Sequence, residues 1–352
     1  MDLHRFAENP LITPAQVAAS QPDFEAIGTF NAGAALYRDE VILLVRVAER
    51  PLARSADDVL YPALNESGAL TVRAIRHDDP RYDVRDPRII RDLHTGAVFL
   101  TSMSHLRLAR STDGIHFAIE SRPFLTPQIP YEAFGVEDAR ITLIDGTYWI
   151  NYSAVSPLGI ATGLVSTRDF VQIERHGIIL PPANRDVVLF PEKIGGRYWC
   201  YHRPMPAYIG DYNIWVAESP DLLHWGNHRV LLRVEADGWE AGRVGGGAPP
   251  IRTPEGWLSI YHAADVQDRY CLGAFLTALD DPARIIARSK TPILEPDAPY
   301  EAAGFYPNVV FTCGAVVRDE MLTIYYGGAD FCIAAASVPI AELVEGLFRG
   351  DA

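Results

Sequence analysis

The sequence predicts an all-β protein, and within that class it favours a β-propeller over a β-sandwich. Helical periodicity is scarce in the chain of 352 residues. Short runs rich in aromatic and β-branched residues follow turns that contain glycine or acidic residues, as the strands of hairpins do. These units recur at a spacing of roughly fifty to sixty residues, which is the scale of one propeller blade.

The first recurring unit is a turn followed by a strand-like run. It occurs as Asp39-Glu40 before VILLVRV, Gly96 before AVFLTSM, Asp145-Gly146 before TYWINYS, Gly195-Gly196 before RYWCYHR, Glu255-Gly256 before WLSIYHA and Asp319-Glu320 before MLTIYYG. Gly (27 residues) and Pro (26 residues) are plentiful, as a fold with many tight turns requires.

Two further patterns keep step with these hairpins. In one, a polar turn leads to an aromatic residue, as in Ser111-Thr112-Asp113 before Phe117, Ser166-Thr167-Arg168-Asp169 before Phe170 and Ser219-Pro220-Asp221 before Trp225. In the other, Asp86-Pro87-Arg88-Ile89 matches Asp138-Ala139-Arg140-Ile141, and Pro191-Glu192-Lys193-Ile194 follows one repeat later. We interpret the latter as one strand position repeated around a common axis, with strand starts near residues 31, 86, 138, 192, 249 and 308. Charged side chains at that position would line a central funnel.

Two segments are expected to be helical. Val338 to Phe348 has Pro339 at its start and Gly350 just beyond its end, which is the usual placement of these residues around a helix. A shorter helix is expected to start at Thr13-Pro14 and run to Ala19.

No linker divides the chain, so residues 1–352 are predicted to form a single domain. The irregular stretch Ala53 to Asp83 is interpreted as a long excursion from the first blade. The segment Gly242 to Gly247 is interpreted as a flexible turn, because it lacks the spacing and the following helix of a nucleotide-binding loop.

The composition excludes several classes of partner. The net charge of -14 repels nucleic acid, and no basic run offsets it, although a local cluster of cations can still bind a small anion. The four cysteines are scattered without a C-x-x-C pair, which indicates buried thiols in a reducing compartment. The N-terminus lacks an apolar leader segment and no apolar run is long enough for a bilayer, so we expect a cytoplasmic protein without membrane contact. No metal-ligand spacing is present, so no metal is expected.

Asp138 is the strongest candidate for chemistry. It lies between Glu137 and Arg140, and these neighbours would tune its pKa for a role as general acid in the funnel. The alternative is a structural Asp–Arg pair that holds adjacent blades together. Asp86 and Arg88 face the same choice, with the structural pairing favoured.

Four cationic or basic residues follow strand positions and would form an anion site if they converge. They are Arg185, Lys193, Arg203 and His262. Arginine and lysine bind phosphate oxygens through charge-assisted hydrogen bonds. For each residue alone, a surface charge or a satisfied core group is the alternative.

Taken together, eight motifs resemble glycoside hydrolase family 130 in their order along nearly the whole chain. They are Phe30-Asn31-Ala32-Gly33, Arg46-Val47-Ala48-Glu49, Asp86-Pro87-Arg88, Gly135-Val136-Glu137-Asp138-Ala139-Arg140, Leu189-Phe190-Pro191-Glu192-Lys193-Ile194, His202-Arg203-Pro204, Ile260-Tyr261-His262 and Tyr325-Tyr326-Gly327-Gly328-Ala329-Asp330. The resemblance implies a five-bladed β-propeller that acts on β-mannosides, in most members as an inverting phosphorylase. Five blades disagree with the six strand starts above unless the termini close one blade together.

The resemblance also implies roles for individual residues. Asp138 matches the general acid, which protonates the glycosidic oxygen through the mannose 3-hydroxyl. The positions that hold the non-reducing mannose are matched by Asn31, Arg46, Asp86, Arg88 and Asp330. The phosphate pocket is matched by Lys193, Arg203, His262 and Tyr270, with Arg185 as a further arginine. Inorganic phosphate is then the co-substrate, no other cofactor is implied, and homo-oligomers are common in the family.

A phosphorylase needs one acid because phosphate is itself the nucleophile, whereas an inverting hydrolase needs two carboxylates with room for a water. Glu192 and Glu240 are the bases available to a hydrolase. The sequence variants around Asn31 and Gly245 resemble phosphorylases of β-1,2-mannobiose and β-1,2-oligomannan, and β-1,4-mannosyl-glucose or mannooligosaccharide phosphorolysis is the next alternative. A non-catalytic sugar-binding propeller is the alternative outside the enzymes.

Overall fold

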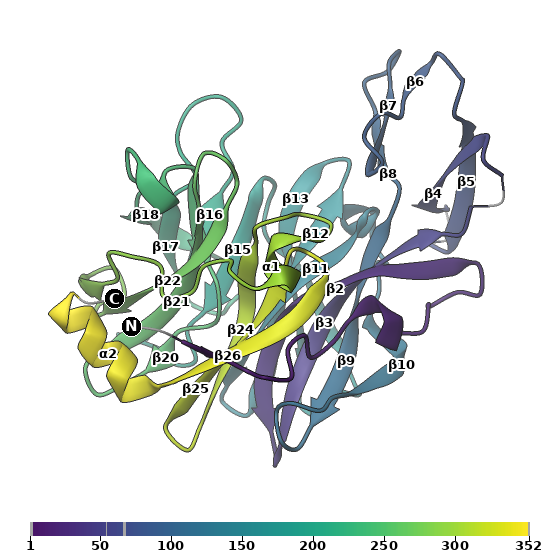
Figure 1. Cartoon of the computed structure of the whole chain (residues 1–352). Helices are drawn as coiled ribbons and strands as arrows, with labels where there is room; N and C mark the ends of the chain where they lie inside the picture. Colours follow the sequence, from purple (N-terminus) through teal and green to yellow (C-terminus); the bar gives the residue numbers. More distant parts are fainter. Residues whose placement is uncertain (1–2, 54, 66–67, 351–352) are drawn as a thin grey trace.

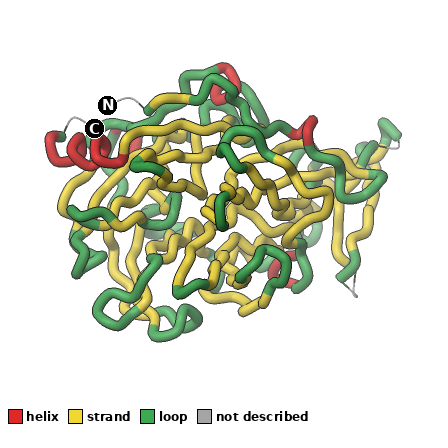
Figure 2. Tube along the Cα trace, turned by 90° about the horizontal axis from the view of Figure 1, so that it is seen from below, coloured by secondary structure: helices red, strands yellow, loops and turns green. Residues whose placement is uncertain are grey.

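A computed structural model describes residues 3–53, 55–65 and 68–350, and it confirms an all-β protein (Figure 1). The described helices are short. They are α1 (Pro299–Ala302), α2 (Ile340–Arg349) and the 3-10 turns Pro14–Gln16, Pro130–Glu132 and Gly238–Glu240. No helix among the described residues is long and apolar enough to cross a membrane. Strands make up most of the trace (Figure 2).

Most strands belong to five antiparallel groups, three of which are separate sheets. The largest sheet has eight strands and joins two such groups side by side: β2 (Phe24–Tyr37), β3 (Glu40–Pro51), β9 (Met103–Ser111) and β10 (Ala118–Leu125), then β11 (Gly135–Ile144), β12 (Thr147–Ser156), β13 (Gly159–Thr167) and β14 (Glu174–Leu180). A second sheet contains β15 (Asn184–Leu189), β16 (Tyr198–Pro204), β17 (Ile214–Ser219) and β18 (Gly226–Leu232). A third contains β19 (Arg243–Gly246), β20 (Ile251–Arg252), β21 (Trp257–Ala264), β22 (Tyr270–Thr277) and β23 (Ile285–Arg288).

The last of these sheets is built from both ends of the chain. It contains β24 (Val310–Arg318), β25 (Met321–Gly328), β26 (Cys332–Pro339) and the short N-terminal strand β1 (His4–Arg5). Strand β1 pairs with β26 in the register His4 to Ser337. The predicted closure of one strand group by the two termini is therefore confirmed.

The predicted turn-and-strand units form hairpins where the turn chemistry allows. Asp145 and Gly146 both have positive φ (50° and 75°) between β11 and β12, as the tightest hairpin turns require. The predicted C-terminal helix is α2, which ends at the left-handed Gly350 (φ 72°). Its Leu343, Val344 and Leu347 are buried against β22 and β26.

An arm leaves the body of the molecule between β3 and β9. It contains the hairpin β4 (Asp58–Leu64) and β5 (Leu70–Arg76) and a small sheet of β6 (Tyr82–Asp83), β7 (Ile89–Asp92) and β8 (Val98–Leu100). Figure 1 shows it projecting at the upper right. The predicted excursion is confirmed, and it extends beyond Asp83 to β8.

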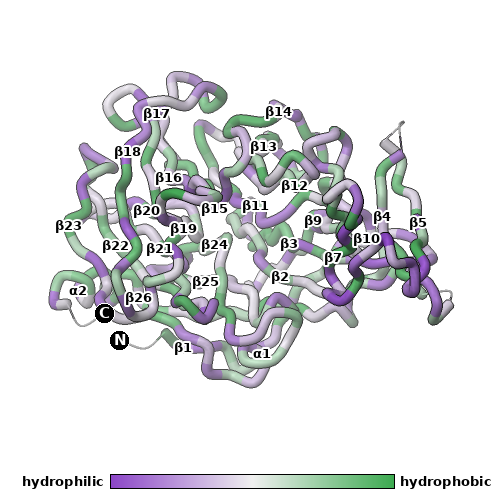
Figure 3. The backbone as a smooth tube through the Cα atoms, turned by 90° about the horizontal axis from the view of Figure 1, so that it is seen from above, coloured by the Kyte–Doolittle hydropathy of each residue, from purple (hydrophilic) through white to green (hydrophobic). Residues whose placement is uncertain are grey.

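Strands β2, β11, β15, β19 and β24 lie toward the middle of the view in Figure 3. Three of them carry a β-bulge whose residue is left-handed: Asn31 (φ 50°) in β2, Asp138 (φ 52°) in β11 and Asp186 (φ 56°) in β15. Asn and Asp tolerate this conformation better than most residues, and a bulge redirects the side chain that it carries. The structurally equivalent positions in these three strands are thus those of Asn31, Asp138 and Asp186.

This register corrects two expectations about the funnel. Asp86-Pro87-Arg88-Ile89 lies in the arm, between β6 and β7, and Pro191-Glu192-Lys193-Ile194 lies beyond the end of β15. Neither segment is the counterpart of Asp138, so the strand starts near residues 86 and 192 were wrong. These segments resemble the motif around Asp138 in their residues. The arm and the β-bulges change the spacing of the chain, so that similar residues do not occupy equivalent positions in the strands.

The predicted flexible turn Gly242 to Gly247 was also wrong. Arg243–Gly246 is strand β19, and its glycines are buried. A Cβ atom on Gly246 would lie 2.6 Å from the Asp186 carbonyl oxygen, so glycine is needed for close packing of backbones and not for flexibility.

Candidate active site

A cavity of about 170 Å³ opens near the middle of the molecule, where the inner strands meet. The inner strands are β2, β11, β15, β19 and β24. Its lining comes from all the main strand groups and is mostly polar or charged: Asn31, Arg46, Asp138, Arg185, Asp186, Arg203, Arg243, Tyr270, Tyr306, Val309, Phe311 and Asp330. Seven of these were predicted from the sequence as site residues. The structure therefore brings together both the predicted acid and most of the predicted anion site.

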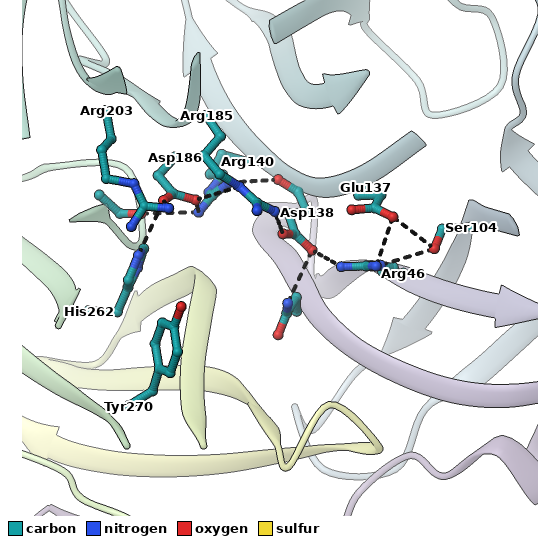
Figure 4. Close-up of polar contacts among 12 residues, drawn as sticks. Arg46, Ser104, Glu137, Asp138, Arg140, Arg185, Asp186, Arg203, His262 and Tyr270 are labelled. Carbon is teal, nitrogen blue, oxygen red and sulfur yellow. Dashed lines mark hydrogen bonds and ion pairs between the residues drawn. The ribbon is translucent and has the colours of Figure 1, made fainter. Parts of the chain in front are cut away.

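Asp138 lines this cavity and is almost fully buried. One carboxylate oxygen, Oδ1, accepts hydrogen bonds from Asn31 Nδ2 at 3.1 Å and Arg46 Nη1 at 3.0 Å, while Oδ2 lies 3.3 Å from Arg185 Nη2 (Figure 4). Burial opposes ionisation, but the guanidinium groups of Arg46, Arg185 and Arg140 outweigh it and hold the pKa of Asp138 below its ordinary value. The ionised form of this acid is thus well stabilised.

Glu137 points to the other side of the same strand end. Its carboxylate pairs with Arg46 Nη2 at 2.8 Å, and Ser104 Oγ lies 3.4 Å from the same oxygen. Burial raises the pKa of Glu137, with the neighbouring Asp138 charge adding to it and Arg46 opposing it. Arg46 therefore links two adjacent carboxylates of opposite pKa behaviour.

Arg140 fulfils the structural alternative that the sequence left open. It is fully buried and donates to the carbonyl oxygens of Asp138 at 3.0 Å and Gly246 at 3.0 Å, and to Gly247 at 3.3 Å. These bonds tie β11 to β19 across the middle of the molecule. The clamp between strands is Arg140, whereas the Asp138 carboxylate faces the cavity.

The cationic side of the cavity is formed by Arg185, Arg203 and Arg243. Arg203 Nη2 pairs with Asp186 at 2.7 Å, but its Nε and Nη1 are buried and have no partner within the described part of the chain. Arg243 Nη1 donates to Tyr270 Oη at 2.8 Å, and its Nη2 pairs with Asp268. Buried N–H groups of a guanidinium cost free energy when they are unpaired, and an anion bound beside Arg203 would supply the missing hydrogen-bond acceptors.

His262 lies behind this cationic side. Its Nε2 is 3.3 Å from Asp186 Oδ2, and its ring lies against Phe311 with centroids 4.2 Å apart. Burial lowers the pKa of His262 to about 4, in spite of the opposing charge of Asp186. The imidazole is therefore neutral at neutral pH and not one of the site's cations, and neither of its ring nitrogens has a hydrogen-bond partner among the described residues.

Asp330 closes the cavity on the side of Asn31 and Arg46. It has a left-handed backbone (φ 50°) in the turn between β25 and β26. Burial raises the pKa of Asp330 to about 6, because Arg46 only partly compensates for the loss of water. A carboxyl group of this kind can donate or accept hydrogen bonds near neutral pH, which suits contacts with sugar hydroxyls.

Three predicted site residues lie elsewhere. Lys193 is exposed and stacks over the Tyr198 ring at 4.6 Å. Asp86 and Arg88 pair with each other at 2.8 Å and line a separate cavity between the arm and Gly304-Phe305. The expectation that these residues meet Asp138 is not met in this structure, because Asp86 and Arg88 lie in the arm and Lys193 lies beyond the end of β15.

The two carboxylates proposed as bases for hydrolysis are also outside the cavity. Glu192 is exposed and pairs with Arg252 at 3.4 Å. Glu240 is buried and accepts from Tyr261 Oη at 2.7 Å while pairing with Arg288. Both are committed to partners of their own.

Sequence reasoning did not select Asp186, Arg243 or Tyr306 as site residues. Asp186 directly follows a predicted residue, Arg185, and an Asx residue early in an inner strand was the signal that could have found it. Arg243 was hidden because its segment was interpreted as a turn. The partners of all three are distant in sequence, so their convergence is visible only in the fold.

Comparisons with known proteins agree with this geometry. A family model described as β-1,4-mannooligosaccharide phosphorylase matches residues 87–348. The chain is 48% identical over 350 residues to β-1,2-mannobiose phosphorylase of Listeria innocua, with 99% of each chain covered. It is 40% identical over 255 residues to 1,2-β-oligomannan phosphorylase of Thermoanaerobacter sp., covering 72% of this chain and 84% of the relative.

A solved structure of the Listeria innocua β-1,2-mannobiose phosphorylase, in complex with β-1,2-mannobiose, matches the model with a TM-score of 0.93. The match has 47% identity and covers 99% of this chain and 100% of the other. The all-β architecture and the order of its strands are therefore shared with a protein of known structure.

Proposed function

Because the chain belongs to glycoside hydrolase family 130, we propose that it is an inverting glycoside phosphorylase. It cleaves β-1,2-mannobiose or short β-1,2-mannooligosaccharides with inorganic phosphate and releases α-D-mannose 1-phosphate. One observation carries this assignment: Arg203, which has two buried nitrogens without a partner among the described residues, lines the same cavity as Asp138. An acid and an anion site in one small cavity are the two parts that phosphorolysis needs.

The geometry supports a division of labour within the cavity. Asp138 supplies the proton to the glycosidic oxygen, through the 3-hydroxyl of the mannose, as the bond from that oxygen to the anomeric carbon breaks. A phosphate oxygen held by Arg185, Arg203, Arg243 and Tyr270 forms the new bond from the opposite face, which inverts the configuration. Asn31, Arg46 and Asp330 are placed to hold the mannose that is transferred.

The ionised Asp138 left after proton transfer is stabilised by its hydrogen bonds from Asn31 and Arg46 and by Arg185. This stabilisation favours departure of the acceptor sugar as a neutral alcohol. A phosphate dianion against Arg185 and Arg203 offsets the positive charge around Asp138, and this favours its protonated form before the reaction. Bound phosphate thus favours the protonated form of Asp138 that the reaction requires.

Hydrolysis is less well supported. An inverting hydrolase needs a free carboxylate base that activates a water. Glu192 and Glu240 lie outside the cavity, and Asp186 is engaged by cations. The β-1,2 linkage is preferred over β-1,4 because relatives named for β-1,2-mannosides are 40–48% identical to this chain, whereas those named for 1,4-linked mannosides are 30% identical.

We further propose that the five strand groups outside the arm are the blades of one five-bladed β-propeller domain spanning residues 1–352. The five inner strands around one cavity and the closure of the last sheet by β1 support this. The four cysteines are free and buried, which fits a cytoplasmic enzyme. Phosphate is proposed as co-substrate with no further cofactor and no metal, and homo-oligomers are expected from the family.

The test is a product assay with β-1,2-mannobiose in the presence and absence of phosphate. We expect α-mannose 1-phosphate to accumulate with phosphate, and negligible free-mannose release without it. Equal mannose release in phosphate-free buffer would support the hydrolase. Silence across β-1,2- and β-1,4-mannosides would support a sugar-binding protein.

A further inference from the structure

One buried carboxylate in the site is not used by the reaction described above. Asp186 is fully buried, and its two oxygens face four basic side chains from four strands. The distances are 2.7 Å to Arg203 Nη2, 3.3 Å to Arg140 Nη2, 3.3 Å to His262 Nε2 and 3.8 Å to Arg185 Nε. Asp186 is therefore the point at which β11, β15, β16 and β21 meet.

The chain makes room for this carboxylate. The bulge in β15 gives Asp186 its left-handed backbone and turns its side chain toward β19. There, a Cβ atom on Gly245 would lie 2.7 Å from Asp186 Oδ2 and 2.4 Å from His262 Nε2. Such distances are too short for any side chain, so glycine at position 245 permits the contact between Asp186 and His262.

A direct chemical role for Asp186 does not fit these contacts. Burial alone would raise the pKa of Asp186, but Arg203, His262 and Arg140 hold it well below its ordinary value. A carboxylate that is this stable as an anion is a poor proton acceptor. Its function therefore lies in the side chains that it holds in place.

We propose that Asp186 is the positioning residue of the phosphate site, an inference that rests on the proposed phosphorolysis. By anchoring Nη2 of Arg203 it leaves Nε and Nη1 directed to the incoming anion. By facing Nε2 of His262 it fixes the ring that packs beside Tyr270 and Phe311. Asp138 and Asp186 thus occupy the same bulge position in two strands, one as the acid and the other as the anchor.

Positioning and simple electrostatics predict opposite results when the charge is removed. If Asp186 merely weakened the positive field of the arginines, Asp186→Asn would tighten phosphate binding. If it holds Arg203 in place, the same change weakens phosphate binding. The direction of the change therefore decides between the two roles.

The first measurement is the KM for phosphate of Asp186→Asn with β-1,2-mannobiose as the other substrate. Without its anchor, Arg203 is expected to lose one charge-assisted hydrogen bond to phosphate, which predicts a rise of about tenfold or more in the KM for phosphate. The KM for the disaccharide should change by no more than about twofold, because Asn31, Arg46 and Asp330 are untouched. An unchanged or lower KM for phosphate would overturn the inference.

Matched controls come from two buried carboxylates outside the site. Glu132 pairs with Arg175 at 2.9 Å, and Glu301 pairs with Arg5 at 2.8 Å, each with a fully buried side chain. Glu132→Gln and Glu301→Gln should lower the melting temperature without a selective change in the KM for phosphate. A selective rise in either control would show that the effect is general loosening, and it would also reject the inference.

A second variant covers the case in which Asp186→Asn fails to fold. Gly245→Ala changes no charge but pushes a methyl group into the contact between Asp186 and His262. It should show the same selective rise in the KM for phosphate. Normal phosphate kinetics in a folded Gly245→Ala enzyme would count against the anchor.

Binding without turnover separates this inference from the proposed function. Inorganic phosphate and sulfate should raise the melting temperature of the wild-type protein, and Asp186→Asn should lose most of that stabilisation. Stabilisation of the wild type without release of α-mannose 1-phosphate would refute phosphorolysis but leave the anchor supported. Equal stabilisation of both proteins, or of neither, would refute the anchor.

Discussion

Arg203 offers the most direct measure of how much the anion site contributes. Two of its nitrogens are buried and unpartnered, and its side chain is only 5% exposed. A hydrogen bond to a charged group contributes about 1.5–3 kcal/mol, so two such bonds to phosphate amount to about 3–6 kcal/mol. Replacement by Met should therefore reduce kcat/KM for phosphate by roughly 10² to 10⁴-fold.

Arg203→Lys is the informative companion. Lysine keeps the charge but cannot present two N–H groups in a fixed plane, so we expect a loss of about tenfold or more through one missing bond. The assay is the initial rate of α-mannose 1-phosphate release at saturating β-1,2-mannobiose with phosphate varied. A change of less than threefold in both variants would refute the reasoning, since it would mean that the unpartnered nitrogens of Arg203 do not face the phosphate.

Three further predictions concern other residues of the site and its surroundings. Asp138→Asn should remain folded and lose about 10² to 10⁴-fold in kcat, as removal of a general acid does, and a nearly active variant would exclude Asp138 from that role. Asp330 has a pKa raised to about 6 in the fold against an ordinary 3.8, so it binds more protons folded than unfolded and lowers the free energy of unfolding as pH rises from about 4 to 6. Asp330→Asn should remove this loss of stability, which amounts to up to about 3 kcal/mol. The free energies of unfolding of variant and wild type, measured by urea titration, should therefore diverge between about pH 4 and 6 and run parallel above pH 7. Parallel pH profiles over the whole range would contradict a raised pKa of Asp330. Lys193→Ala should leave the KM for phosphate within about twofold, because the side chain is exposed over Tyr198, and a large increase would restore Lys193 to the phosphate site.

The hairpins could be predicted from sequence because their signals are local. A turn such as Asp145-Gly146 and the run that follows it are adjacent in the chain, and their backbone preferences suffice to specify the pairing. The presence of Asp138 in the cavity could also be predicted, since Asp138 lies in a run of distinctive residues that resembles a family motif. The local signals did not reveal how far equivalent strand positions are separated along the chain.

That offset decided which charged residues meet. The β-bulges in β2, β11 and β15 add a residue at the point where the side chain turns to the cavity, and the arm inserts a long segment after β3. Matching letters such as Asp86-Pro87-Arg88 and Glu192-Lys193 therefore pointed to the wrong positions. Asp186 was overlooked because its contacts are with Arg203 on the paired strand β16 and with Arg140 and His262, which lie on other sheets and meet it only after the sheets have packed.

The pairing of the two chain ends has a consequence for synthesis in the cell. The N-terminal segment lies along β26: Leu11 N donates to Ile333 O at 2.8 Å, and Asn9 exchanges hydrogen bonds with Ala335 at 2.8 and 2.9 Å. A ribosome makes this segment long before β26, so residues 4–12 must wait for the intervening sheets before they can pair. Earlier sheets can form as they emerge, but the final sheet and the side of the cavity that carries Asp330 are completed only after β26 has emerged. We therefore expect the nascent chain to be inactive until β26 has been made, so that translation sets the moment at which the site is assembled.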